Sequence, residues 1–142
     1  MVGRSSQRCP NERGAAAVEF ALIVPILLTL VFGMIDFGLA INRYTMLNNA
    51  AREGVRAASL SASAAEVSTV VNDRLADLKG KVSVTVSCKT PTGGSCGSWD
   101  TGRTAGGIAV VTATYQHSWL TPVGKLISPQ LTLSKTSEMR IE

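Results

Sequence analysis

The sequence predicts an α+β protein. A long N-terminal transmembrane helix is expected to continue into an exported helix, followed by a second helix and a small antiparallel sheet of about three strands. An apolar block from Ala15 to Ile35 is the first observation behind this prediction. Apolar residues then recur at helical spacing in segments 41–61 and 61–80. Finally, apolar and polar residues alternate in segments 81–88 and 131–142, which is typical of half-buried strands, and segment 108–120 is expected to be a strand that is denser in apolar residues.

The chain has 142 residues, which is enough for one modest core beside a membrane segment. Its net charge is +4. Three arginines against one glutamate give +2 in residues 1–14, and the other 11 basic and 9 acidic residues are dispersed. Recognition of nucleic acid requires basic residues clustered on one face, so we expect no nucleic-acid partner.

The apolar block has the length of a membrane span. At about 1.5 Å per residue, a helix from Ala15 to Ile35 is roughly 30 Å long, which matches the hydrocarbon core of a bilayer. Pro25 removes one hydrogen bond within this helix and is expected to bend it.

The flanks of the block predict its orientation. Arg4, Arg8 and Arg13 precede it, so the positive-inside rule keeps residues 1–14 in the cytoplasm. We therefore expect a cytoplasmic leader at 1–14, a transmembrane helix at 15–42 and an extracytoplasmic module at 43–142. No small-x-small cleavage site follows the block, so the helix is expected to anchor the protein as a single-pass span of the cell membrane.

The three cysteines lie on both sides of the span. Cys9 precedes it, whereas Cys88 and Cys96 follow it with seven residues between them. Outside the cytoplasm the latter pair is expected to form a disulfide. Metal binding by the pair is the alternative, but His117 is distant in sequence and these residues make a poor zinc site.

Glu19 is a carboxylate inside the apolar block. One interpretation is that its side chain reaches the lipid headgroups from the first turn of a tilted helix. The other is that Glu19 pairs with an amine created by cleavage after Gly14, since the new N-terminus at Ala15 would lie one helical turn away. Such a pair, within one chain or between copies, would set the register of parallel helices.

Several motifs occur in a fixed order along the first 60 residues. Gly14 is followed by four residues and then "EF", the apolar run leads to "DFG", and "AAREG" follows. In this order the segment resembles the TadE-like family of Tad (Flp) type IVb pilus minor pilins and pseudopilins. The matching positions are Gly14, Glu19, Phe20, Pro25, Asp36, Phe37, Gly38, Ala50, Ala51, Arg52, Glu53 and Gly54.

The resemblance implies a pilin-like module and cleavage after Gly14 by a prepilin peptidase, a site that includes Ala15, Glu19 and Phe20. It also implies that the mature protein takes part in assembling a Tad pilus used in adhesion, biofilm formation or secretion. Its implied partners are the peptidase, other pilins or pseudopilins and the Tad assembly platform. The residues expected to act in helix assembly are Glu19, Pro25, Asp36 and Gly38. The alternative is a bitopic envelope protein whose exported binding module never enters a filament.

The exported helical segments have recognisable faces. An alanine-rich stripe from Met46 to Ala58 is suited either to the protein's own sheet or to a neighbouring helix. In the second helix, Ser63 and Glu66 fit a capping box and Gly80 is the expected stop. Its expected apolar face comprises Val67, Val70, Val71, Leu75 and Leu78.

The sequence of each strand segment predicts which of its side chains face the core. Val82, Val84, Val86 and Cys88 share one side of the first strand. The segment 89–107 is rich in turn residues and is expected to be a surface loop, and a helix in the connection 121–129 is left open. The expected core positions of the last strand are Leu131, Leu133, Met139 and Ile141.

Residues that carry enzyme chemistry are sparse. His117 is the only histidine and is expected at the surface of a strand. Trp99, Tyr115 and Trp119 are expected to anchor the core or a loop, with a binding patch as the alternative. No P-loop, nucleophile elbow or metal motif occurs, so we expect no enzyme activity, metal or cofactor.

Overall fold

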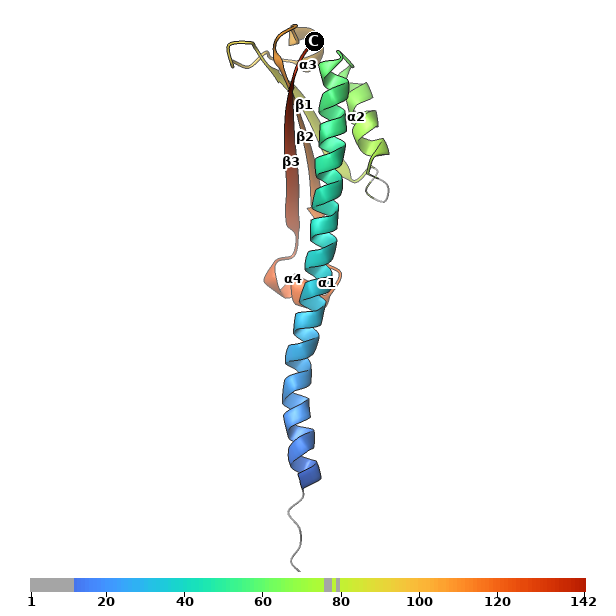
Figure 1. The fold of residues 1–142 in the computed structure, drawn as a ribbon, viewed down its shortest axis with the longest axis vertical. Helices are drawn as coiled ribbons and strands as arrows, with labels where there is room; N and C mark the ends of the chain where they lie inside the picture. Colours follow the sequence, from blue (N-terminus) through green and yellow to red (C-terminus); the bar gives the residue numbers. More distant parts are fainter. Residues whose placement is uncertain (1–11, 76–77, 79) are drawn as a thin grey trace, which may run out of the picture.

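The computed structural model describes residues 12–142 except 76, 77 and 79. Its dominant element is one uninterrupted helix, α1 (Glu12–Ser59), which contains both the apolar block and the alanine-rich stripe. The remaining elements cluster around the C-terminal half of α1 and leave its N-terminal half bare (Figure 1). The α+β prediction is therefore confirmed, with a long apolar helix, a second helix and a three-stranded antiparallel sheet.

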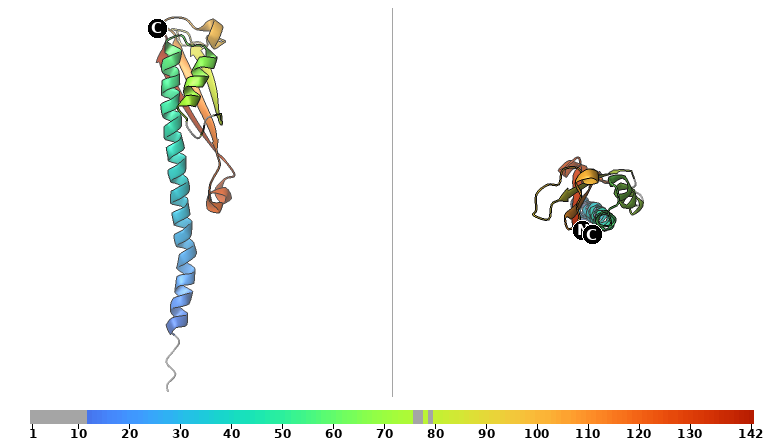
Figure 2. Two further views of the ribbon diagram at one scale, coloured as in Figure 1. Left: turned by 90° about the vertical axis from the view of Figure 1, so that its right-hand side faces the viewer. Right: turned by 90° about the horizontal axis from the view of Figure 1, so that it is seen from above.

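The module has two layers, with α1 and α2 (Ala64–Asp73) on one face of the sheet (Figure 2). The sheet consists of β1 (Val82–Lys89), β2 (Ile108–His117) and β3 (Leu131–Arg140). The strands lie in the order β1-β2-β3, and both pairs are antiparallel. Two short helices complete the fold, α3 (Trp99–Gly102) and α4 (Pro122–Ile127).

The alanine-rich stripe of α1 packs on the protein's own module, which answers the question that the sequence left open. Leu47, Ala50, Ala51 and Ala58 have no exposed surface, and they share a core with residues of α2 and the sheet. Small side chains here let the helices and the sheet approach closely. At Gly54 a Cβ atom would collide with a Val71 methyl group, so glycine is required for this approach.

The second helix begins as predicted and ends early. Ser63 and Glu66 form the capping box, with Ser63 N–H donating to Glu66 Oε2 at 2.8 Å. The helix ends at Asp73 rather than near Gly80, because the N–H groups of Arg74 and Leu75 bond to carbonyls three residues back. Gly80, with φ +74°, forms a turn beyond the helix. Leu75 and Leu78 are nevertheless fully buried, as expected.

The sheet confirms most inward positions. Val82 and Cys88 are buried, and Leu131 and Leu133 are half-buried. Met139 is 41% exposed, so its assignment to the core was wrong. It lies on the edge strand β3, beside an open groove between that strand and α1, instead of under a helix. Ile141 is buried as predicted.

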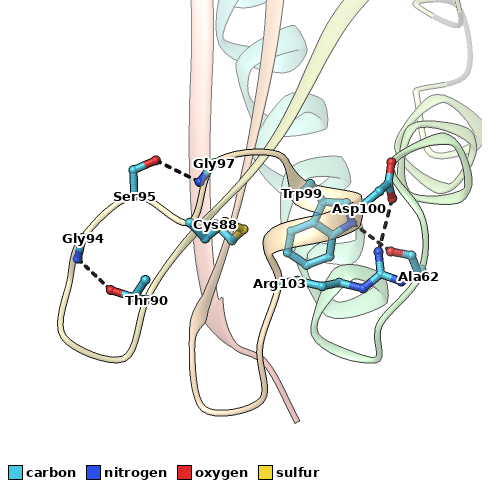
Figure 3. The surroundings of a disulfide bond; sticks show 10 residues. Ala62, Cys88, Thr90, Gly94, Ser95, Gly97, Trp99, Asp100 and Arg103 are labelled. Atoms are coloured by element: carbon cyan, nitrogen blue, oxygen red, sulfur yellow. Dashed lines mark hydrogen bonds and ion pairs between the residues drawn. A yellow bond between two sulfur atoms is a disulfide. The ribbon is translucent and has the colours of Figure 1, made fainter.

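The loop between β1 and β2 is only partly a surface loop. It contains α3, whose Trp99 is 3% exposed and donates its indole N–H to the Ala62 carbonyl at 3.0 Å (Figure 3). Tyr115 and Trp119 are also buried, so all three aromatic side chains anchor the fold. The connection after β2 does form a helix, α4.

Candidate functional site

The expected processing segment lies on the bare part of α1. From Gly14 to Phe20 every residue is exposed, and Phe20 is 70% exposed. Glu19 has no hydrogen-bond or ion-pair partner among the residues that the structure describes. Cys9 and the arginines at positions 4 and 8 lie outside the described residues. The roles of Gly14, Ala15, Glu19 and Phe20 in processing therefore remain predictions.

This bare segment has the properties of a membrane span. It belongs to a helix whose most apolar 18-residue window has a mean hydropathy of 2.5 and no residue buried inside the protein. Among the described residues it is the one helix long and apolar enough to cross a membrane. This fits a single-pass membrane protein.

Pro25 lies inside this helix without ending it. Proline has no backbone N–H, so the helix lacks one of its backbone hydrogen bonds here. The Thr29 hydroxyl donates a hydrogen bond to the Pro25 carbonyl at 2.7 Å. Pro25, Ile26, Thr29 and Leu30 line a shallow apolar groove on the helix surface. Gly33 and Gly38 have open space where a Cβ atom would stand. The helix surface thus offers a groove and two flat positions, and the assembly roles of Pro25 and Gly38 stay predictions.

The surroundings of Asp36 were not predicted from the sequence. It is 2% exposed, although it lies in the range 15–42 expected to span the membrane. Its Oδ1 accepts hydrogen bonds from the Leu120 N–H at 3.0 Å and the Thr121 N–H at 3.3 Å. Its Oδ2 accepts a bond from the Thr121 hydroxyl. Asp36 therefore ties α1 to the start of α4, and its expected part in helix assembly is untested.

A glycine makes this tie possible. A Cβ atom on Gly124 would lie 2.6 Å from Asp36 Oδ2 and 2.7 Å from Trp119 Cβ. Thr121 is the N-cap of α4, and its side chain accepts a bond from the Gly124 N–H. Asp36, Thr121 and Gly124 thus form one compact joint, which we call the Asp36 joint.

His117 lies next to this joint and is buried. The expectation of a surface histidine was wrong, since His117 is only 2% exposed. It packs edge-on against Trp119, with ring centroids 5.4 Å apart, and neither ring nitrogen has a hydrogen-bond partner in the described structure. Burial, followed by the nearby Arg43 charge, lowers the pKa of His117, and the Asp36 carboxylate opposes this effect. The available signal was the alternation, which places His117 in phase with the inward Ala113 and Tyr115.

The "AAREG" run is used within the module. Ala50, Ala51 and Gly54 face the core, whereas Arg52 is exposed. Glu53 forms an ion pair with Arg74, with 3.3 Å between Glu53 Oε1 and Arg74 Nη2. The small residues of the run therefore serve packing, and the charged pair faces outward.

Cys88 and Cys96 are joined by a disulfide. Their Cα atoms are 5.4 Å apart, a usual separation for such a bond. The bridge fastens the turn after β1 (Figure 3). In this turn the Cys96 N–H also donates to the Cys88 carbonyl at 3.2 Å. Among the described residues no group of three or more His, Cys, Asp or Glu side chains is placed to hold a metal ion.

Comparison with known families gives one result for this chain. Residues 14–56 match the family model described as TadE-like protein, which confirms the resemblance over the apolar half of α1 and most of its packed half. Comparisons with curated proteins and with solved structures gave no match. Residues 14–56 are therefore a TadE-like segment, followed by a helix-and-sheet module that the family model does not cover.

Proposed function

We propose that this protein is a TadE-like pseudopilin or minor pilin of a Tad (Flp) pilus. In this proposal a prepilin peptidase cuts after Gly14, and the mature chain takes part in assembling a pilus used in adhesion, biofilm formation or secretion. The TadE-like segment supports the general class, a structural protein of pilus assembly. The cut, the partners and the position in the pilus are our inference.

One observation carries the proposal. The helix of the TadE-like segment projects from the module as a bare rod (Figure 1). From Gly14 to Ile35 it is apolar and carries a single charged residue, Glu19. Large side chains such as Phe20, Leu22 and Ile26 are more than half exposed. Exposed surface of this kind is unfavourable in water and is covered by lipid or by other helices. A pseudopilin uses the same surface for both, first in the membrane and then in an assembly.

Glu19 has a defined task in this mechanism. Cleavage after Gly14 places an ammonium group on Ala15, four residues before Glu19 and about 6 Å along the helix axis. In an apolar medium an unpaired carboxylate is costly, and an ammonium partner offsets that cost. We infer that the Glu19 of one copy meets the Ala15 amine of the next and thereby sets the stagger between parallel helices.

The neighbouring surface suits a second helix. The groove at Pro25–Leu30 accepts side chains, while Gly33 and Gly38 permit close approach. The arginine-rich leader places the N-terminus in the cytoplasm, where the peptidase and the assembly platform would act, and the module outside.

Mapping of the mature N-terminus tests the first step. Protein purified from the native host's membranes should begin at Ala15 when its N-terminal peptide is identified by mass spectrometry. Gly14→Val should leave the full-length chain uncut, because a bulkier residue precedes the scissile bond. An intact residue 1 in the wild type, or a cut beyond Ile35, would overturn the proposal.

Substitution of Glu19 tests the second step. Glu19→Ala should insert into the membrane normally yet enter pili poorly, and Glu19→Gln should share this defect because it lacks the charge. Glu53→Gln is the matched control, since it neutralises an exposed glutamate of the same helix outside the bare region. Unchanged incorporation of both Glu19 variants would favour the simpler role, in which Glu19 only reaches toward headgroups.

A second candidate function is a bitopic envelope protein that never enters a filament. The Asp36 joint favours it to a degree, because that carboxylate is fully used within one chain. An uncleaved anchor, with no pilus in which the protein is found, would establish this function. Genes for a prepilin peptidase and a secretion ATPase beside this gene would argue for the pilus.

A further inference from the structure

The segment 119–127, which includes α4, forms a foot at the end of the module nearest the bare part of α1. Both side views place α4 there, beyond the end of the sheet (Figures 1 and 2). The Asp36 joint attaches the foot to α1 through the Leu120 and Thr121 N–H groups. The foot is therefore held at a fixed level along α1, the level of Asp36.

That level coincides with the expected outer boundary of the membrane. A helix from Ala15 to Ile35 spans roughly 30 Å, so the hydrocarbon core ends about where Asp36 begins. The surface of α1 stays apolar past this point, with Phe37 61% and Ile41 64% exposed. The foot thus lies beside apolar helix surface at the depth where headgroups meet acyl chains.

The foot itself presents large apolar side chains to its surroundings. Leu126 is 87% exposed and Leu120 is 68% exposed. Beyond α1, the described part of the chain has four exposed large hydrophobic residues, and the other two are Leu60 at 65% and Met139 at 41%. Half of them are therefore on a foot of nine residues, beside an exposed cation, Lys125.

We propose that the foot docks on the lipid surface, with Leu120 and Leu126 in the headgroup–acyl boundary of the leaflet that α1 leaves. Lys125 faces the phosphates there, since a lysine can extend its charge to the headgroups from an apolar surface. Lipid is the occupant because the foot lies at the level of Asp36, where its Trp119 packs edge-on against the exposed Phe37 of the apolar helix surface. This inference depends on α1 crossing a membrane and does not depend on cleavage or on a pilus.

Docking has a structural consequence. A single helix leaves its module free to tilt and rotate on the membrane, whereas a second contact beside the helix restricts both motions. The foot would fix the tilt of the module relative to the membrane. It would also fix the rotation of α1, and thereby which face of the helix points toward neighbouring chains.

Site-specific fluorescence in single-copy nanodiscs tests the proposal. The full chain with Cys9→Ser and an intact Cys88–Cys96 bridge is labelled with the polarity-sensitive dye NBD at Leu126→Cys. The matched control carries the label at Leu60→Cys, also an exposed leucine position (65%), just past the other end of α1. Discs of phosphatidylcholine and phosphatidylglycerol are compared with and without a lipid bearing a doxyl quencher high in its acyl chain.

The proposal predicts that the label at 126 emits at shorter wavelength than the label at 60 and loses emission in doxyl discs, while the label at 60 does not. Equal quenching of both labels, or of neither, would overturn it. Shielding at 126 that appears only with two copies per disc would also overturn it, because a second copy would then be the occupant. A second readout is amide exchange of segment 120–127 in the discs, which Leu126→Ser should accelerate and Leu60→Ser should leave unchanged.

Discussion

The two halves of α1 have the same backbone and opposite surroundings. None of residues 14–35, the bare half, is buried, and most of their large side chains are exposed. Residues 36–59, the covered half, bury one face against α2, α4 and the sheet. The change occurs at Asp36, the first buried residue after Gly14, which accepts hydrogen bonds from the module. One helix thus joins a bare apolar segment, which fits a membrane span, to a segment stabilised by tertiary packing.

The largest expected difference between the halves concerns leucine truncation. Leu47→Ala removes a side chain with no exposed surface and should lower the free energy of unfolding of the module by about 2–5 kcal/mol. Leu27→Ala, in the bare half, should leave that free energy unchanged, because Leu27 is 55% exposed and does not belong to the core of the module. Denaturant unfolding in detergent, followed by the buried tryptophans, measures both. Equal losses would mean that the halves are not energetically distinct.

Glycine substitution is expected to have the next largest effect. Gly54→Ala places a methyl group against Val71 and should destabilise the module by about 1–3 kcal/mol through overpacking. Gly33→Ala meets no atom within 4 Å and should not change module stability. Thermal unfolding of the two variants compares them directly. A stable Gly54→Ala protein would contradict the close approach of α1 and α2.

Replacement of Asp36, at the boundary between the halves, should weaken the attachment of the foot to α1. Asp36→Ala leaves the N–H groups of Leu120 and Thr121 without their acceptor, at a cost of about 1–3 kcal/mol for a buried group. Hydrogen exchange at these two amides should accelerate. Glu53→Gln, which breaks an exposed ion pair expected to contribute about 0–1 kcal/mol, should leave them protected. Unchanged exchange in Asp36→Ala would show that the foot does not depend on this carboxylate.

The smallest expected effect is a pH dependence of the covered half. Because burial lowers the pKa of His117, the unfolded chain binds a proton more readily than the folded one. Stability should therefore fall as the pH drops below the ordinary histidine value of 6.5, and should level off below the pKa in the folded state. Asp36 and Arg43 of α1 face this ring from the helix side with opposite influences. His117→Leu should remove the slope just below pH 6.5, and a slope of unchanged size would assign it to another group.

Features that depend on residues close together in the chain could be predicted from the sequence. The capping box, the alternation in β1 and the apolar stripe of α1 each depend on residues close in sequence, and the structure has them. The sequence did not predict the Asp36 joint, because Asp36 and Thr121 are 85 residues apart and become partners only through the fold. The early end of α2 was missed for a related reason. The Asn72 side chain accepts a bond from the Gly80 N–H and draws the chain back into a turn.

The candidate site residues show the same difference between what local sequence patterns predict and what only the fold brings together. Gly14, Glu19 and Phe20 were assigned from a local sequence pattern through its resemblance to a family, and their role in processing remains a prediction. His117 was misplaced because a polar residue near a strand end was taken for a surface residue, although its phase matched the core. Met139 was in phase with the core but lies on an edge strand that no helix covers at that point.

A depth scan along α1 tests the central claim most directly. Single cysteines from position 15 to 58, in the Cys9→Ser chain with its bridge intact, carry nitroxide labels in lipid vesicles, and accessibility to oxygen and to a water-soluble nickel complex is measured. We predict that oxygen reaches the labels and nickel does not from 15 to 35. Nickel access should begin between 36 and 41, and from 42 onward it should alternate with the covered and open faces of the helix. Nickel access throughout 15–35, or lipid-like values continuing to position 58, would contradict the division of α1 at Asp36.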